Sequence, residues 1–254
     1  MPMKILLSPA KSLDFTSPLP TAEFSLPAFE KESAAVMKVL KKKSATQLAD
    51  LMELSIKLAE LNKERNAVWE QPFTPENARP ALYAFAGDVY TGLEAYTLPE
   101  TSFDLAQNQV RILSGLYGML KPFDLMQEYR LEMGTSLPIG KSKNLYEFWK
   151  TKLSKALRAE LEPGELLLNL ASKEYFSVLD AKLFSSELVT VDFYDLHQGQ
   201  YKMISFFAKK ARGMMARYLI DSQAITIDDI KGFTYGGYQF DANQSTERRL
   251  VFTR

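Results

Sequence analysis

Apolar, strand-like runs at irregular intervals, with helical stretches of unequal length between them, most strongly limit how this chain can fold. The best strand candidates are residues 3–8, 165–172 and 187–195, with the sequences MKILLS, ELLLNLAS and ELVTVDFYD. Residues 232–254 predict two further strands joined by a polar loop. Because these runs do not alternate regularly with helices, we expect an α+β fold with a mixed sheet surrounded by helices.

Helical periodicity fills much of the remaining chain. Residues 29–43 predict one helix, and Ser44 with Gln47 predicts a capping box that opens a second helix over 45–69. The HQGQ sequence at 197–200 predicts a hairpin turn leading into residues 201–208. With 254 residues, 46% of them apolar, and no low-complexity linker, we expect one domain over 1–254.

Composition excludes several kinds of site. The chain has no cysteine and one histidine, His197, so thiolate nucleophiles, disulfides and Cys- or His-rich metal sites are excluded, and we predict neither a metal nor a cofactor. The N-terminal apolar run is too short for a secretory signal, and no segment reaches the roughly 18 apolar residues of a membrane span. We therefore expect a cytoplasmic protein without a membrane partner.

Local charge is more informative than the overall balance of 31 basic and 31 acidic residues. Residues 196–220 contain five Lys or Arg and no acid, and residues 206–219 predict a helix. A helical wheel places Lys209, Lys210, Arg212 and Arg217 on one face, with Gly213 in its middle. Glycine lowers helix stability by about 1 kcal/mol relative to alanine, but it permits close approach of a phosphate or a backbone. The helix therefore predicts phosphate contacts with DNA, and a solvated face is the alternative.

Two other segments could contribute to such a surface. Residues 141–158 hold six Lys or Arg against the single acid Glu147, and they enclose the aromatic sequence LYEFW, which could stack on bases or pack in the core. In the sequence LSGLYGMLK, Gly115, Gly118 and Lys121 could form the phosphate-binding turn of a helix-hairpin-helix element. A plain tight turn in the core is the alternative, because Pro122 would shorten the second helix.

Polar side chains at predicted strand-to-loop transitions form a second group of candidates. They are Lys11, Asp88, Tyr90, Arg130, Glu132, Ser172, Lys173, Glu174 and Tyr175. We expect Lys11, Arg130 and at least one of Glu132, Lys173 and Glu174 to line one concavity, because strand ends can hold polar groups at the mouth of a cleft.

This second group has an enzymatic interpretation and a structural one. A lysine beside carboxylates can act as a nucleophile or base on a nucleobase or sugar, so a DNA lyase or glycosylase-like enzyme using Lys11 is an alternative to simple binding. Arg130 and Glu132 could instead form only a structural ion pair. A protein that binds nucleotides or small anions is a third possibility.

Several of these sequences together resemble the YaaA family of bacterial peroxide-stress proteins (UPF0246). They are LLSPAKSLDF, FTPENARPALYAFAGDVYTGL, RILSGLYGMLKPFDLMQEYRLEMG, LYEFW, LLLNLASKEYF and ISFFAKKARGMMARYLI, in collinear order over nearly the whole chain. The resemblance implies a fold particular to that family, a positively charged cleft, a helix-hairpin-helix element, and binding of duplex or branched DNA in oxidative-stress protection and DNA repair. It implies no reaction and no obligate protein partner.

The resemblance also links the family to lower free iron under peroxide, that is, to iron homeostasis. One histidine and no cysteine offer no recognisable iron site in this chain. We therefore expect protection to act at the DNA, and the missing thiols exclude peroxide sensing by cysteine oxidation.

Overall fold

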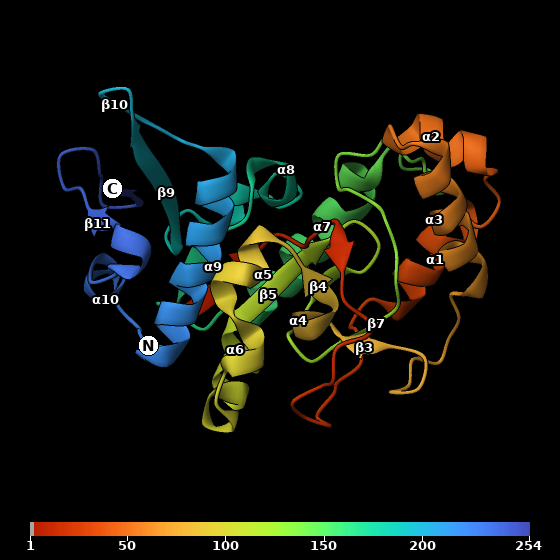
Figure 1. Cartoon of the computed structure of the whole chain (residues 1–254), viewed down its shortest axis with the longest axis horizontal. Helices are drawn as coiled ribbons and strands as arrows, with labels where there is room; N and C mark the ends of the chain where they lie inside the picture. Colours follow the sequence, from red (N-terminus) through yellow and green to blue (C-terminus); the bar gives the residue numbers. More distant parts are fainter. Residues whose placement is uncertain (1–2) are drawn as a thin grey trace.

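An eight-stranded sheet runs through the centre of the computed structural model, which describes residues 3–254 (Figure 1). The order across the sheet is β11-β12-β9-β8-β1-β5-β6, and β10 pairs with β9. The strands are β1 (Met3–Leu7), β5 (Val110–Ser114), β6 (Gly118–Leu120), β8 (Leu166–Asn169), β9 (Leu188–His197), β10 (Gln200–Lys202), β11 (Gln239–Phe240) and β12 (Arg249–Thr253). The strands expected in 3–8, 165–172 and 187–195 and the two C-terminal strands are confirmed.

The five strands β12, β9, β8, β1 and β5 are mutually parallel, and antiparallel strands lie at both edges. The mixed sheet is therefore confirmed, although its parallel centre requires the crossover connections that the irregular spacing along the chain concealed. All five residues of β1 are buried, as expected for a central strand covered on both faces.

The strand order defines one special position at the centre of the sheet. Numbered along the chain, the parallel strands lie in the order 2-1-3-4-5, with β5 second, β1 first and β8 third. The chain therefore leaves β1 toward one edge and later returns to the other side of it at β8. In sheets of this order, the carboxyl ends of the first and third strands border the crevice in which ligands bind.

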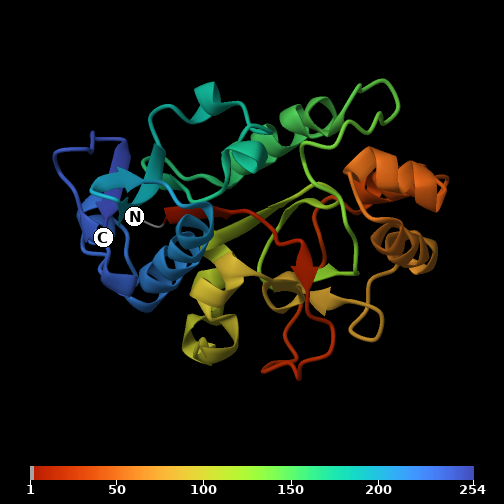
Figure 2. The ribbon, with the colours of Figure 1, turned by 45° about the horizontal axis from the view of Figure 1, so that its top comes forward.

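Helices cover both faces of the sheet: α7 lies on one side, and α6 and α9 lie on the other (Figure 2). The helices are α1 (Glu30–Leu40), α2 (Ala45–Met52), α3 (Ile56–Val68), α4 (Ala81–Ala84), α5 (Asp88–Leu93), α6 (Phe103–Gln109), α7 (Leu145–Glu160), α8 (Lys173–Phe176), α9 (Ser205–Asp221) and α10 (Ile227–Lys231). Short 3₁₀ turns are η1 (Ala95–Thr97), η2 (Glu100–Ser102), η3 (Ala181–Phe184) and η4 (Tyr235–Gly237). Two two-stranded ribbons complete the fold, β2 (Ser12–Leu13) with β4 (Phe85–Ala86) and β3 (Arg79–Pro80) with β7 (Leu125–Met126).

The helix predicted over 45–69 is divided in two. The capping box of Ser44 and Gln47 is present at the start of α2, as predicted. Glu53 then adopts a left-handed conformation that ends α2, and the Ser55 side chain accepts a hydrogen bond from the Leu58 backbone N–H to begin α3. Serine favours helix caps because its hydroxyl satisfies a free backbone donor.

The helix-hairpin-helix interpretation of the two glycines is wrong, and the core-turn alternative is correct. Gly115 and Gly118 lie in and beside the buried turn that joins the antiparallel strands β5 and β6. Gly118 has a φ of +72°, and a Cβ there would lie 2.7 Å from the Trp149 ring. A Cβ at Gly115 would lie 2.5 Å from the Leu131 carbonyl oxygen. Neither backbone can approach a phosphate, because protein atoms already fill the space.

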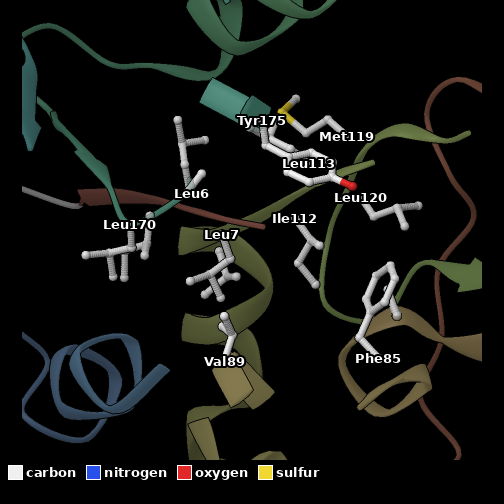
Figure 3. Close-up of a cluster of buried hydrophobic side chains, with 14 of the residues drawn as sticks. Leu6, Leu7, Phe85, Val89, Ile112, Leu113, Met119, Leu120, Leu170 and Tyr175 are labelled. Carbon is white, nitrogen blue, oxygen red and sulfur yellow. The ribbon is translucent and has the colours of Figure 1, made fainter. Parts of the chain in front are cut away.

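This turn belongs to the main core. Side chains of β1, β5 and β6 gather with Val89 of α5 in one buried cluster (Figure 3). The aromatic residues of LYEFW are part of α7, and Trp149 is fully buried with its indole N–H donating to the Gly115 carbonyl. The core interpretation of that aromatic segment is therefore correct for Trp149.

The predicted hairpin at 197–200 is also present. Gln198 and Gly199 both have positive φ, and they join β9 to β10. The second strand is shorter than the expected 201–208, because α9 already begins at Ser205.

Candidate functional site

A cavity of about 280 Å³ lies at the carboxyl ends of β1 and β8, the position that the strand order singles out. Four segments and one single residue line it: the loop after β1 (Ser8, Pro9, Ala10, Lys11, Ser12), the start of α5 (Ala86, Gly87, Asp88, Val89), the start of α8 (Ser172, Glu174, Tyr175), Glu132, and the α9 residues Lys209 and Arg212. Val89 and Tyr175 also belong to the core cluster of Figure 3, so the cavity has an apolar floor.

Hydrogen bonds between separate segments hold this floor together. The Ser172 backbone N–H donates to Ser8 Oγ at 2.8 Å, which joins the loops that follow β8 and β1. The buried Tyr90 hydroxyl donates to the Ser8 carbonyl at 3.2 Å. Pairing of β2 with β4 places Ser12 opposite Ala86 and connects the β1 loop to the chain entering α5. These contacts join the segments that form the cavity walls.

Helix α9 reaches the cavity because it packs unusually closely against α5. A Cβ at Gly213 would lie 1.8 Å from the Val89 carbonyl oxygen, and a Cβ at Gly92 would lie 2.1 Å from the Lys210 carbonyl oxygen. The expectation that Gly213 lies in the middle of an exposed basic face is therefore wrong. Gly213 is buried, and it permits close approach of a backbone, not of a phosphate.

Arg212, like Arg130, has a buried Nε with no hydrogen-bonding partner among residues 3–254, but of the two only Arg130 forms an ion pair within that range. Burial lowers the pKa of the Arg212 guanidinium, and the charge of Asp192 opposes that shift. A buried donor without a partner is costly, so the Nε of Arg212, on a side chain that lines the cavity, points to this side chain as a candidate anion-binding group. Lys209, one turn earlier on α9, is exposed at the same cavity.

Carboxylates lie on the other walls. Glu132 pairs with Lys11 Nζ at 2.8 Å and with Arg130 at 3.4 Å. Glu174 Oε1 accepts a hydrogen bond of 3.0 Å from the Gly134 backbone N–H. Asp88 lines the cavity and forms no ion pair with any residue of the described chain.

The predicted concavity is confirmed as a matter of position. Lys11, Arg130 and Glu132 line a small recess that shares Lys11 and Glu132 with the main cavity. The structural ion pair between Arg130 and Glu132 is present as well. Lys173 is exposed at the start of α8 and lies outside the lining of both cavities.

The other basic residues of α9 do not form one free face. The Arg217 guanidinium donates to Thr97 Oγ1 at 2.7 Å and to the Glu94 carbonyl at 3.0 Å, and it pairs with Asp221 at 2.8 Å. These bonds fasten α9 to the turn after α5, so the side chain expected to contact a phosphate is already engaged within the protein. Lys210 is exposed but does not line the cavity.

Lys121 belongs to a different place from the cavity. It lines a recess with Arg111, Asp124 and Glu160, and its backbone N–H donates to Asp124 at 2.8 Å. Residues 110–120 form the β5–β6 hairpin and not a helix-hairpin-helix element, so the phosphate contact expected of Lys121 within such an element has no support.

Sequence reasoning missed Ser8 and Gly92. Ser8 gave no signal, because its role depends on β8 lying beside β1. Gly92 and Gly213 did offer one, since both are glycines inside helical segments, where glycine usually needs a packing reason.

Among residues 3–254, no group of three or more metal-ligating side chains could hold an ion, and no helix is both long and apolar enough to cross a membrane.

The fold and the site together define a class. This is a protein with a mainly parallel sheet and a charged cavity at its topological switch point, and two of the cations in the lining come from a helix whose glycine packs against the backbone of the neighbouring helix.

Comparison with known proteins makes the identification more specific. Residues 3–244 match the model of the family described as peroxide stress protein YaaA. The chain is 60% identical to a UPF0246 protein of Flavobacterium johnsoniae and 53% identical to one of Flavobacterium psychrophilum, in each case over 99% of this chain and 100% of the relative. A UPF0246 protein of a Marinomonas species is 50% identical over 99% of this chain and 97% of its own. The chain therefore belongs to the YaaA family, and the resemblance seen in the sequence is confirmed.

Proposed function

We propose that this protein acts in the cytoplasmic response to peroxide stress by binding duplex or branched DNA through backbone phosphates at the rim of the switch-point cavity. The observation that supports this proposal is Arg212, a half-buried residue that lines the cavity and whose buried Nε has no hydrogen-bonding partner among residues 3–254. Guanidinium groups bind phosphate through parallel N–H···O bonds, and Lys209 adds a second cation on the same helix.

The basic side chains of α9 at the cavity support binding of an anionic partner. Lys11 is already paired with Glu132, whereas neither Lys209 nor Arg212 forms an ion pair with any residue in 3–254. The exposed Lys210 lies next to Lys209 and can extend the contact along the DNA phosphate backbone. These side chains supply affinity and position without reading bases.

Fluorescence anisotropy of a labelled duplex at several salt concentrations tests the proposal. Each phosphate contact that is removed should reduce the slope of log affinity against log salt by about 0.9. We expect Lys209→Ala with Arg212→Met to flatten the slope by up to about 2, with circular dichroism showing an intact fold. Lys63→Ala on the distant, exposed helix α3 is the matched control and should leave the slope unchanged. An unchanged slope in the double variant would refute this surface and direct attention to residues 141–158.

A DNA lyase or glycosylase-like activity is a second candidate, favoured by the Lys11–Glu132 pair at 2.8 Å in the same cavity. Once deprotonated, Lys11 Nζ would attack the aldehyde carbon of an abasic deoxyribose, water would leave, and a Schiff base would form, with Glu132 placed to accept the proton. Borohydride reduction of a mixture with abasic DNA should then trap a covalent adduct that Lys11→Ala abolishes. Absence of any adduct would exclude this mechanism.

A further inference from the structure

We infer that the switch-point cavity is a site for one nucleotide lying outside the base stack, with its phosphate at Arg212 and Lys209 and its base facing Asp88. This inference rests on the proposed DNA binding and specifies the feature of DNA that the protein selects.

Size limits what can enter. The cavity volume of about 280 Å³ is near the lower end of the usual range for small-molecule sites. One nucleotide unit can fit, whereas a base pair within a duplex cannot. The floor is prearranged, because hydrogen bonds of Ser8 to Ser172 and Tyr90 and the close α5–α9 contact hold the walls.

Charge determines the kind of ligand. Within residues 3–254, the lining cations Arg212 and Lys209 form no ion pair, and neither does the carboxylate of Asp88. A complementary ligand therefore carries an anion at one end and N–H donors at another. A nucleotide has both, since exocyclic amino groups of bases donate to carboxylates as they do in groove recognition.

The surface beside the cavity fits a DNA strand from which one base has been extruded. Phe206 is 55% exposed and lies three residues before Lys209, so the two side chains share one side of α9 a turn apart. Its ring meets that of Phe207 edge-on, with centroids 5.6 Å apart. Exposed aromatic side chains next to phosphate-binding cations stack on unpaired bases or wedge between base steps. Phe206 is placed to occupy the gap that the extruded base leaves.

The experiment compares a fully paired duplex with the same duplex carrying one bulged 2-aminopurine nucleotide, by anisotropy and by 2-aminopurine fluorescence. We expect about tenfold tighter binding of the bulged duplex and a rise in fluorescence as the base unstacks. Asp88→Asn and Phe206→Ala should each bring the preference close to one while leaving affinity for the paired duplex within about twofold.

Matched controls separate site effects from general ones. Asp104→Asn, in the first turn of α6, and Phe24→Ala, a 50% exposed aromatic in the N-terminal loop, should retain the full preference. Phe206 and Asp88 are not core residues, and circular dichroism should show that their variants remain folded.

Each outcome bears on a specific claim. Equal binding of both duplexes would overturn the extruded-nucleotide site and leave the proposed DNA binding intact. A preference that survives both Asp88→Asn and Phe206→Ala would show that it arises elsewhere and would also overturn the site. Binding of free dCMP, seen as a thermal shift sensitive to Arg212→Met, without binding of either duplex would retain the nucleotide site and refute DNA as its source. Binding of none of the three would overturn both proposals.

Discussion

The close contact between α5 and α9 makes the sharpest stability prediction, Gly213→Ala. The new Cβ would lie 1.8 Å from the Val89 carbonyl oxygen and 2.8 Å from the Leu93 nitrogen. Ordinary carbon–oxygen contacts begin at about 3.3 Å, so the two helices must separate by about 1.5 Å. Both opposing atoms belong to the backbone, so no change of rotamer can relieve the clash.

The magnitude follows from two opposing effects. Overpacking of this kind costs about 1–3 kcal/mol and more where backbone must move, whereas replacing glycine in a helix interior returns about 1 kcal/mol. We expect the first effect to exceed the second, lowering the free energy of unfolding by at least about 2 kcal/mol and the Tm by roughly 4–8 °C. Separation of α9 from α5 should also displace Arg212 and weaken binding at the cavity.

Thermal unfolding followed by circular dichroism measures this effect, with Lys210→Ala on the exposed side of α9 as the control. Gly92→Ala should behave like Gly213→Ala, because its Cβ would lie 2.1 Å from the Lys210 carbonyl oxygen in the same interface. The double variant should cost less than the sum of the two, because one separation relieves both clashes. A Gly213→Ala variant with an unchanged or higher Tm would refute the packing argument.

Three further predictions concern other positions. Gly118→Ala should lower the free energy of unfolding by about 2–3 kcal/mol, because it forces a side chain into a left-handed backbone and against Trp149; guanidinium unfolding monitored by tryptophan fluorescence checks this. Arg217→Ala should lower stability by about 1–2 kcal/mol through lost hydrogen bonds to Thr97 and should leave the salt dependence of DNA binding unchanged; a flatter salt slope would contradict its structural role. Burial raises the pKa of Asp124 from 3.8 to about 6, so the folded state binds this proton more tightly than the unfolded state. The resulting stability, roughly 3 kcal/mol, is present below pH 4 and is lost as the pH rises through 6, and denaturation of Asp124→Asn at pH 4.5 and 7 should show a smaller difference than wild type.

Local elements could be predicted from the sequence because their causes are local. The strands β1 and β8 follow from short, mostly apolar runs, and β9 follows from the alternation of apolar and polar residues in LVTVDFYD. The start of α2 follows from side chains three residues apart that hydrogen-bond each other's backbone. The placement of Lys11, Arg130 and Glu132 around one recess was also predictable, because each follows the end of a buried segment. Membership of the YaaA family could be recognised from the sequence for the same reason, because the motifs that carry the resemblance are short, local segments in a fixed order along the chain.

Relations between distant segments required the tertiary structure. The parallel order that makes β1 and β8 neighbours depends on crossovers of many residues, and no local pattern encodes which strands pair. The pairing creates the cavity, because it places Ser8 beside Ser172 and brings the start of α5 to the same edge.

The helix α9 shows the same division within one element. Its residues predicted a helix with basic side chains, and the helix is present. A helical wheel ranks positions by polarity alone and cannot say what packs against them. The backbone of α5 fills the space beside Gly213, the turn after α5 binds Arg217, and the cavity receives Arg212. Four basic residues that look equivalent in sequence thus acquire different roles, because charge is a property of the side chain, whereas its availability to a ligand depends on the neighbours that the fold supplies.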